Sequence, residues 1–337
     1  MSFLLVLIMI FKSLMNNLSA SLLELRSKSH FIRNFHQVLF GVLMLLLIAS
    51  TVCVHAQESS QYAMYENAFP VFNPGTTGLY NKYAATFITR FPSSEVMYYS
   101  NSESLIYEQR VDKLNSGFGA NITYANLMYY EYDWKVALNY AYHFDLKKAG
   151  RLGAGLSVGN VFRGVDYDYR YDEGDGIDYR YSRLFLNFGL AYQIKNLNLG
   201  VSISELYFTN TSKYGYEGVE RKSIVLNAFT SYDIKLNPRL TLTPAIYANF
   251  YEKRIHEIDY RMTLNIKERL WVGMSVSNYK LDWRLHTSGP ISKLYSKRMI
   301  GYDLFGRYRI GYAISLDTFL ITNWTGFHEI VLAWRVK

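Results

Sequence analysis

The chain has 337 residues, of which 17% are Phe, Trp or Tyr and only 19% are charged, and its formal net charge is +8. The charged fraction lies below the roughly 25% of an average soluble domain, and aromatic residues are favoured in strands and at membrane interfaces. The single cysteine, Cys53, lies in an N-terminal apolar stretch, which excludes disulfide and thiol chemistry from the rest of the chain.

Residues 1–56 are predicted to be an N-terminal extension and secretory signal peptide. Arg33 and His36 precede the apolar run 38–50, and residues 54–56 have the small-residue pattern of a cleavage site. A buried or membrane-spanning helix is the alternative, but the run is short of the roughly 20 apolar residues that a span requires. Without this segment the chain has 281 residues and a net charge of +5, because the segment holds four basic residues and one acidic residue. A charge this modest does not indicate a nucleic-acid binder.

Residues 57–79 are expected to form an ordered but irregular N-terminal segment on the periplasmic side. Their polarity does not alternate, so they are not expected to form a strand. Turn-forming residues are frequent among them, namely Pro70, Asn73-Pro74-Gly75 and Gly78. The segment is predicted to lead into the first strand.

From residue 80 to the C-terminus, apolar residues alternate with small or polar ones. In 134–145 and 184–195 the even positions are apolar or aromatic, and the odd positions are mostly small, polar or charged. Successive side chains of a strand point to opposite faces, so each such segment is predicted to be a strand with one apolar face. Leu190 is expected to face lipid, and Ala191 a lumen in which a charged side chain stays hydrated. Segments of about ten residues with this alternation are typical of transmembrane β-barrels.

The last segment, 326–337, shows the same alternation. Ile330, Leu332 and Trp334 are apolar, whereas Glu329 is charged. In a membrane β-barrel the last strand pairs with the first and removes both edges of the sheet. An edge strand of a soluble β-sandwich is the alternative that this strand alone leaves open.

The lengths of the connections decide between these two folds. Outer-membrane barrels have short periplasmic turns and longer external loops, whereas a Greek-key sandwich has no reason to alternate in this way. The sequence therefore predicts an all-β fold, a transmembrane antiparallel up-and-down β-barrel of about 14 strands over residues 80–337. Short links are predicted at 145–150, 195–198, 236–239, 266–270 and 304–307, and longer links at 164–180, 209–221, 252–257, 284–295 and 317–325.

Two positions disturb the alternation. Glu205 falls on the apolar parity of the segment 197–203, which predicts a β-bulge at this point. Pro244 lies inside the segment 240–250, where a proline removes one hydrogen bond of the ladder.

Two motifs stand near the ends of the mature chain. The first is Asn73-Pro74-Gly75-Thr76-Thr77-Gly78, preceded by Gln61-Tyr62, and the second is Gly326-Phe327-His328-Glu329-Ile330-Val331-Leu332. They resemble the Asn-Pro-Ala-x-x-Gly element, with its preceding Gln-Tyr, and the closing Gly-Ser-His-Glu-Ile-x-Leu of the PorP/SprF family, outer-membrane proteins of the type IX secretion system. Segments 270–273 and 309–312 fit two further family motifs, so the resemblance covers nearly all of residues 57–337. Phe327 departs from the family pattern, which has a small residue there.

This resemblance implies a non-enzymatic barrel of the type IX secretion and gliding machinery in the bacterial outer membrane, exported by its signal peptide. Such a barrel assists the export or surface anchoring of secreted proteins. The implied partners are secreted surface proteins, other secretion-system components and outer-membrane lipid, with no nucleic acid and no cofactor. A channel or uptake barrel for small solutes, including hydrophobic ones, is the alternative function. The positions that carry the resemblance are Asn73, Pro74, Gly78, Gly326, His328 and Glu329.

One long link combines acidic and aromatic residues. Rigid, amphipathic tyrosines are enriched at protein interfaces, so the tyrosines of this link are predicted to contact a partner. Its carboxylates are of the kind that bind calcium, but their spacing does not match an EF-hand, and a solvated external loop is the simpler interpretation. The tyrosines are Tyr167, Tyr169, Tyr171 and Tyr179, and the acidic residues are Asp166, Asp168, Asp172, Glu173, Asp175 and Asp178.

The remaining motifs do not indicate catalysis. Gly153, Gly155 and Gly159 share one parity and no helix follows them, so they are interpreted as small residues facing the barrel interior rather than as a nucleotide-binding loop. No motif supports a barrel lipase, and His328-Glu329 is expected to make a structural or docking contact. The mature chain has four histidines without metal-ligand spacing, His143, His256, His286 and His328.

Overall fold

The computed structural model describes residues 62–92, 101–126, 131–165, 179–207, 211–212, 225–251, 254–281, 291–317 and 326–336. The predicted signal peptide and the acidic part of the link 164–180 lie outside these residues. Within them, no helix has the length and apolar character needed to cross a membrane.

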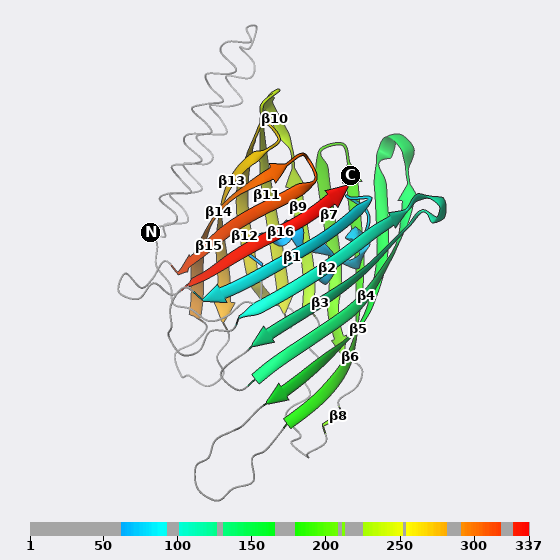
Figure 1. Cartoon of the computed structure of the whole chain (residues 1–337), viewed down its shortest axis with the longest axis vertical. Helices are drawn as coiled ribbons and strands as arrows, with labels where there is room; N and C mark the ends of the chain where they lie inside the picture. The colour runs from blue at the N-terminus through cyan, green and yellow to red at the C-terminus, as the bar shows by residue number, and fades with distance from the viewer. Residues whose placement is uncertain are drawn as a thin grey trace, which may run out of the picture. The chain divides into compact units, whose positions relative to one another are not determined.

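Fourteen antiparallel strands form one closed sheet in which sequence neighbours pair with each other, as Figure 1 shows. This is the up-and-down barrel that the alternation predicts. Two short pieces accompany it: β8 (Thr211–Ser212) pairs with β6, and β10 (Ile234–Asn237) continues β9 after a break at Asp233. The fourteen strands are β1 (Tyr83–Pro92), β2 (Ser102–Val111), β3 (Ser116–Asn126), β4 (Glu131–Asp145), β5 (Arg151–Val165), β6 (Tyr179–Ile194), β7 (Leu197–Tyr207), β9 (Val225–Tyr232), β11 (Leu240–Tyr251), β12 (Arg254–Ile266), β13 (Leu270–Leu281), β14 (Ile291–Leu304), β15 (Tyr308–Asp317) and β16 (Gly326–Val336).

The C-terminal strand closes the barrel, as its sequence predicts. β16 pairs with β1 along the whole of β1, from Tyr83 opposite Val336 to Pro92 opposite Phe327. Figure 1 shows β16 in red beside β1. On the other side of the ring, β9 pairs with β11. Closure removes the unpaired edges that make open sheets prone to aggregation.

The two faces of the sheet differ as the alternation predicts. Leu138 of β4 is 68% exposed, whereas its neighbours Ala137 and Asn139 are 2% and 4% exposed on the inner face. In β6, Leu190 is exposed and Ala191 is buried. An apolar outer face on a closed ring, with every strand paired on both sides, suits a hydrocarbon environment.

One charged side chain interrupts the outer face in the middle of a strand. Arg298 stands at the centre of β14 and is exposed, while its neighbours Lys297 and Met299 are buried on the inner face. In a β-barrel, an arginine that faces lipid at the bilayer midplane costs about 2–4 kcal/mol. The rest of the outer face of β14 on the side of the tight turns is apolar or aromatic, with Ile300 and Tyr302 both exposed.

Most connections alternate in length around the barrel, as predicted, although the links at 127–130 and 252–253 at the long-link end are short. One end carries only tight links, at residues 112–115, 146–150, 195–196, 238–239, 267–269 and 305–307. Left-handed backbone conformations allow several of these tight turns, for example at Lys195 (φ 49°) and Gly306 (φ 67°). The links at the other end include the long ones at 93–101, 166–178, 208–224, 282–290 and 318–325.

The prediction of a longer link at 252–257 is wrong. Tyr251 pairs with Arg254, so β11 and β12 are joined by residues 252–253 alone. The segment 252–257 is rich in charged residues. A strand that continues beyond the apolar band no longer needs apolar residues, and charge alone therefore does not mark its end.

Both irregularities that the sequence predicts appear in the sheet. The register between β6 and β7 shifts between Leu186 and Phe188, and Glu205 in the bulge has a φ of 61°. Pro244 lies within β11, next to the position where β9 and β10 are interrupted at Asp233. The missing N–H of the proline is thus accommodated where the ladder is already broken.

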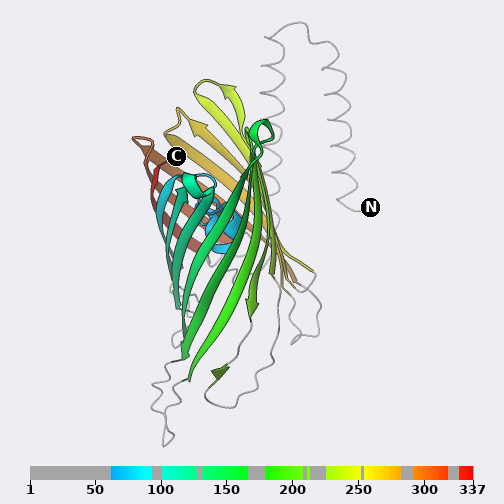
Figure 2. The ribbon, with the colours of Figure 1, turned by 90° about the vertical axis from the view of Figure 1, so that its right-hand side faces the viewer.

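Residues 62–79 lie inside the ring of strands and are called the plug from here on. They form the 3-10 turn η1 (Tyr65–Asn67), the single helical turn α3 (Phe69–Phe72) and the 3-10 turn η2 (Pro74–Thr76). These turns are drawn in blue within the barrel in Figure 2. The side chain of Asn73 caps η2, because its Oδ1 accepts a hydrogen bond of 3.0 Å from the N–H of Gly75. The periplasmic position assigned to residues 57–79 stays a prediction.

The expectation that a charged side chain at residue 191 would stay hydrated is wrong. Ala191 is 1% exposed, so an arginine there would have no water around it. Ser231 is a better inner-face position for comparison, because it lines a cavity that also contains Glu66 and Asp233.

We expect Leu190→Arg to impair assembly of the barrel far more than Ser231→Arg. An arginine on the lipid face costs about 2–4 kcal/mol, whereas an arginine beside the lumenal carboxylates stays hydrated and near negative charge. Heat-modifiability on gels measures the folded fraction of each variant. Equal folded fractions for the two variants would contradict the orientation of β6 and β9.

Candidate functional site

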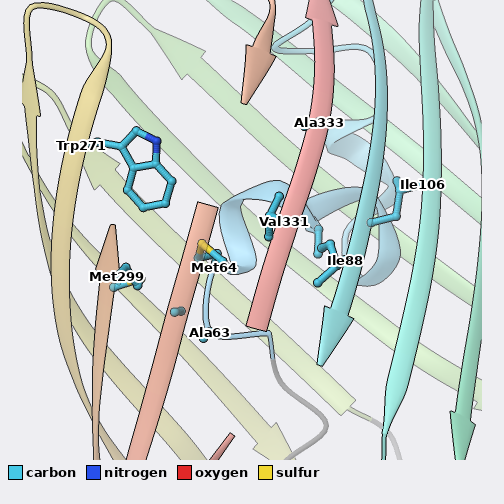
Figure 3. Packing of buried hydrophobic residues seen from close by; sticks show 10 residues of the cluster. Ala63, Met64, Ile88, Ile106, Trp271, Met299, Val331 and Ala333 are labelled. Atoms are coloured by element: carbon cyan, nitrogen blue, oxygen red, sulfur yellow. The ribbon is translucent and has the colours of Figure 1, made fainter. Parts of the chain in front are cut away.

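The plug forms the hydrophobic core of the barrel interior. Its residues Ala63, Met64 and Ala68 are buried together with side chains from the inner faces of six strands, as Figure 3 shows for most of them. The partners on the wall are Ile88, Ile106, Trp271, Met299, Ala313, Val331 and Ala333. A barrel of this size is able to enclose a water-filled lumen, but this level of the lumen is packed with side chains.

Stacked aromatic rings bind a second part of the plug to the inner face of the barrel. Phe69 of α3 stacks on Phe229 of β9, with ring centroids 4.1 Å apart. Tyr65 stacks on Tyr247 of β11 at 5.0 Å. Such pairs are worth about 0.5–1.5 kcal/mol beyond the area they bury, so the plug is bound on the side of β9 and β11 as well.

Glu329 ties the N-terminal end of the plug to the closing strand. This glutamate is 1% exposed on the inner face of β16. Its two carboxylate oxygens accept hydrogen bonds from the backbone N–H groups of Ala63, at 2.6 Å, and Met64, at 2.7 Å. A buried N–H without an acceptor costs about 1–3 kcal/mol, and a buried carboxylate equally needs donors. The contact therefore satisfies the plug and Glu329 together.

Asn73 joins the middle of the plug to two neighbouring strands. It is 1% exposed, and its Nδ2 donates to the carbonyl oxygens of Leu190 in β6, at 3.1 Å, and Val201 in β7, at 3.2 Å. Its Oδ1 is the acceptor that caps η2. Only a short amide side chain supplies two donors and an acceptor at this position, which explains the asparagine of the first motif.

Glycines on the inner faces of β5 and β6 let the plug backbone lie directly on the strands. A Cβ added at Gly155 would stand 2.3 Å from the carbonyl carbon of Pro74, and one at Gly189 would stand 2.1 Å from Oδ1 of Asn73. Neither position has room for a side chain. The interpretation of Gly153, Gly155 and Gly159 as small residues facing the interior is confirmed, because an added Cβ at each would meet atoms of the plug or of inner-face residues.

The C-terminal end of the plug is held by β2 and β4. Nε2 of His143 lies 3.0 Å from the carbonyl oxygen of Thr77, so this nitrogen carries the donated proton. Glu108 accepts hydrogen bonds of 2.9 Å from the N–H of Gly78 and from Nδ2 of Asn81. Gly78 has a φ of 68°, which side chains other than glycine rarely adopt, and the chain then enters β1.

A charged network on the wall of β12 to β14 faces the plug. Arg261 forms an ion pair with Glu66, donates to the carbonyl oxygen of Ala63, and places its guanidinium 3.8 Å from the ring centroid of Tyr65. Behind it, Nζ of Lys297 lies 2.9 Å from Asp259, which also accepts hydrogen bonds from the hydroxyls of two serines, Ser275 and Ser277. A buried ionic network is costly unless its members are paired, so removing one partner is expected to be destabilising.

The plug tyrosines remain neutral over the physiological range. Burial raises the pKa of Tyr65 above its ordinary value, and the nearby Arg261 opposes this only in part. Burial likewise raises the pKa of Tyr62, whose hydroxyl lies 2.7 Å from Oγ of Ser104. Both side chains therefore act as hydrogen-bonding and aromatic groups rather than as ionised ones.

Two cavities that share lining residues border the plug. The larger has a volume of about 370 Å³ and is lined in part by Tyr80, Glu108 and Arg335. The smaller, of about 150 Å³, is lined in part by Arg261 and Trp271. Glu66, Phe69, Ser231 and Thr243 line both. Over the described ranges, no group of three or more His, Cys, Asp or Glu side chains is arranged to hold a metal ion.

The structure brings the two sequence motifs together around the plug. Asn73, Pro74 and Gly78 belong to the plug, and Glu329 binds its N-terminal end. Gly326 begins β16, and His328 lies on the outer face between Phe91 and Tyr312, with its Nδ1 2.6 Å from the hydroxyl of Tyr312. Tyr167, Tyr169 and Tyr171 lie outside the described residues, and Tyr179 is the first residue of β6.

Several residues that bind the plug or belong to the charged network facing it were not identified from the sequence. Glu108, Arg261 and Lys297 are charged residues on the inner parity of their strands. The alternation of Glu257, Asp259 and Arg261 along β12 contains the relevant signal, because three ionisable side chains two residues apart share one face of a strand. Such a face requires counter-charges or hydrogen-bond partners inside the barrel.

The closed fourteen-stranded ring with an apolar outer face defines an outer-membrane β-barrel. Residues 54–334 match the family model of the type IX secretion system membrane protein PorP/SprF. The chain therefore belongs to the PorP/SprF family, as the two motifs indicate. No individually curated protein is significantly similar to it in sequence.

Several solved outer-membrane proteins are similar to this chain at low identity and with TM-scores below 0.5. Omp33 of Acinetobacter baumannii is 9% identical, with a TM-score of 0.44, and the match covers 77% of this chain and 100% of that one. The toluene transporter TodX of Pseudomonas putida is 11% identical, with a TM-score of 0.45 and coverage of 84% and 98%. The toluene transporter TbuX of Ralstonia pickettii is 12% identical, with a TM-score of 0.41 and coverage of 80% and 94%.

We expect Glu329→Ala to loosen the N-terminal end of the plug while the barrel still forms. The substitution leaves the N–H groups of Ala63 and Met64 without their acceptor, at a cost of about 1–3 kcal/mol for each buried group. Hydrogen exchange measured by mass spectrometry should become faster in residues 62–70 and remain slow in the strands. Glu103→Ala, an exposed glutamate in β2, is the matched control. Unchanged exchange in the plug of Glu329→Ala would show that the contact does not hold it.

We expect Gly155→Ala to lower the thermal stability of the folded barrel more than Gly273→Ala. The new methyl group at residue 155 would meet the plug backbone at 2.3 Å, whereas at residue 273 its nearest neighbours include the flexible end of Met299 at 3.2 Å. Overpacking of this kind costs about 1–3 kcal/mol. The midpoint of the heat-induced band shift on gels measures the difference. Equal midpoints would mean that the plug is free to move away from β5.

Proposed function

We propose that this protein is a non-enzymatic docking barrel of the type IX secretion machinery. In this role it assists the export or surface anchoring of secreted proteins. Its long links would hold a secreted client outside the cell, and its tight-turn end would contact other secretion components.

The observation that carries this proposal is the occupied lumen. The plug is fixed at its beginning by Glu329, in its middle by Asn73, and at its end by His143 and Glu108. These anchors stand on β16, β6 and β7, β4 and β2, so the segment crosses the interior and contacts several parts of the wall. A barrel filled in this way suits a rigid scaffold better than a solute pore. This supports docking over uptake as the function of the family member described here.

The composition of the longest links supports a protein partner. Tyr167, Tyr169 and Tyr171 stand in the link between β5 and β6, and long links follow β7 and β13. Tyrosine offers a large, rigid and amphipathic contact surface, and a few such residues dominate the affinity of many interfaces. The strands on which these links stand give them a rigid base.

Replacing Tyr167, Tyr169 and Tyr171 together by serine is expected to weaken the retention or export of a secreted surface protein roughly tenfold or more, as the loss of interface hot spots does. The barrel should still fold, because external links contribute little to its closure. The measurement compares the surface abundance of secreted proteins in wild-type and variant strains. Asp166→Asn combined with Asp168→Asn is the control that alters the same link without removing aromatic area.

Uptake of small solutes by the same strains, together with conductance in planar bilayers, tests the alternative function. The docking proposal expects both quantities to be the same for the wild type and the tyrosine variant, and the wild-type conductance to be negligible. If solute uptake falls while every secreted protein reaches the surface normally, the docking proposal is wrong and the uptake barrel takes its place.

A further inference from the structure

A single arginine stands in the apolar outer face of β14. Its side chain is exposed, and the buried Lys297 and Met299 on either side fix its outward direction. Across the strands, Arg298 lies opposite Met274 of β13 and Ile314 of β15. Its directly opposite neighbours on this face are therefore apolar, and the polar side chains nearest to it are Ser296, two residues along β14, and His328 of β16, which lies opposite Ile314.

Arg298 lies deep within the apolar band. Aromatic girdles mark the interfaces of membrane barrels, and we therefore assign the interface on the side of the tight turns to Tyr302, four residues along β14 on the same face. A rise of about 3.4 Å per residue and a strand tilt of about 40° place Arg298 roughly 10 Å further into a band about 25 Å tall. An extended arginine side chain spans about 7 Å by standard bond lengths, which is too short to bring its charge fully to the headgroups.

Arg298 has no ion pair with any carboxylate among the described residues, although such pairs are frequent on the inner face and at the rim. Charged residues within a membrane are rare and usually have a partner. We propose that the outer face of β13 to β15 docks a second outer-membrane protein, whose own lipid-facing surface presents a carboxylate to Arg298. Met274, Ile300 and Ile314 would surround this charge pair with apolar contacts and exclude lipid from it.

The charge distribution favours a different protein over a second copy of this chain. A two-fold dimer through this sector would bring the two Arg298 side chains toward each other. Among the outward positions whose side chains are described, the acidic residue is Glu103, which lies at the long-link end of β2. The described part of a second copy therefore offers no carboxylate at the depth of Arg298. Phosphate groups of lipid lie at the headgroup level, beyond the reach estimated for this side chain.

This inference concerns the lateral face of the barrel and does not depend on client docking at the external links. The experiment places a photoreactive amino acid at Met274 or Ile314 in otherwise wild-type protein, in intact outer membranes. The matched control position is Leu138 on β4, which is also exposed to lipid. We expect crosslinks to one outer-membrane protein from residues 274 and 314, and lipid adducts alone from residue 138.

The role of the charge is tested by substitution of Arg298 in the crosslinking protein. Arg298→Leu should reduce the protein crosslink at least tenfold, while heat-modifiability shows that the barrel is still folded. Arg298→Glu should abolish the crosslink, and replacing the carboxylate mapped at the crosslinked surface of the partner by lysine should restore it. The proposal is supported when the crosslink is lost in the Arg298 variants and restored by the lysine substitution in the partner. Capture of a protein alone does not support it.

Three outcomes would overturn the proposal. Lipid adducts alone at residues 274 and 314 would mean that Arg298 is accommodated by the bilayer. Crosslinks to a second copy of this chain would assign the face to self-association. A protein crosslink that is unchanged in a folded Arg298→Leu variant would mean that the charge plays no part in the contact.

Discussion

The fit between the plug and the inner wall is the constraint on which the rest of the structure depends. A ring of fourteen strands leaves an interior that has to be filled with water or with protein. Here residues 62–79 occupy it, and the inner face of the sheet is shaped to receive them. Glycines lie where the plug backbone contacts the wall, and aromatic residues lie where the rings of the plug stack on it. Ionisable residues lie where polar groups of the plug need hydrogen-bond partners. The identities of the inner-face residues therefore follow from their contacts with the plug and not from a general need to line a water-filled lumen.

Barrel closure and plug binding are coupled through the last strand. β16 pairs with β1 on its edge and, through Glu329, binds the segment that precedes β1 in the chain. The two contacts join residues that are at least 235 positions apart in sequence. Contacts over such separations form late and slowly, because the loop must close before the contact can form. The two short motifs therefore meet in the closed barrel, where the strand that closes the ring also binds the plug.

The sequence was sufficient to predict the strands of the barrel, but not the way in which the plug occupies the interior. Period-two alternation identifies which residues face outward, so the fourteen strands, the closing pair and the bulge at Glu205 could be anticipated. The same alternation says only that Ala191 and Gly155 face inward, and not what lies opposite them. The plug has no period of its own, because it consists of three short turns that are stabilised by the wall. Its anchors depend on contacts such as Arg261 with Glu66, which are separated by 195 residues and leave no local pattern.

Two neighbouring residues of β14, Lys297 and Arg298, show that the face of the sheet decides how a charged side chain is compensated. Lys297 points inward, where Asp259 and Glu257 of the same chain compensate it. Arg298 points outward, where the adjacent strands present a methionine and an isoleucine. The two residues have the same formal charge and adjacent positions, but they occupy opposite faces of the strand. A barrel satisfies its inner charges by folding, since strands and plug bring both partners from one chain. Arg298 has no carboxylate partner among the described residues of the same chain, so its compensation depends on the lipid or protein that surrounds the barrel in the membrane.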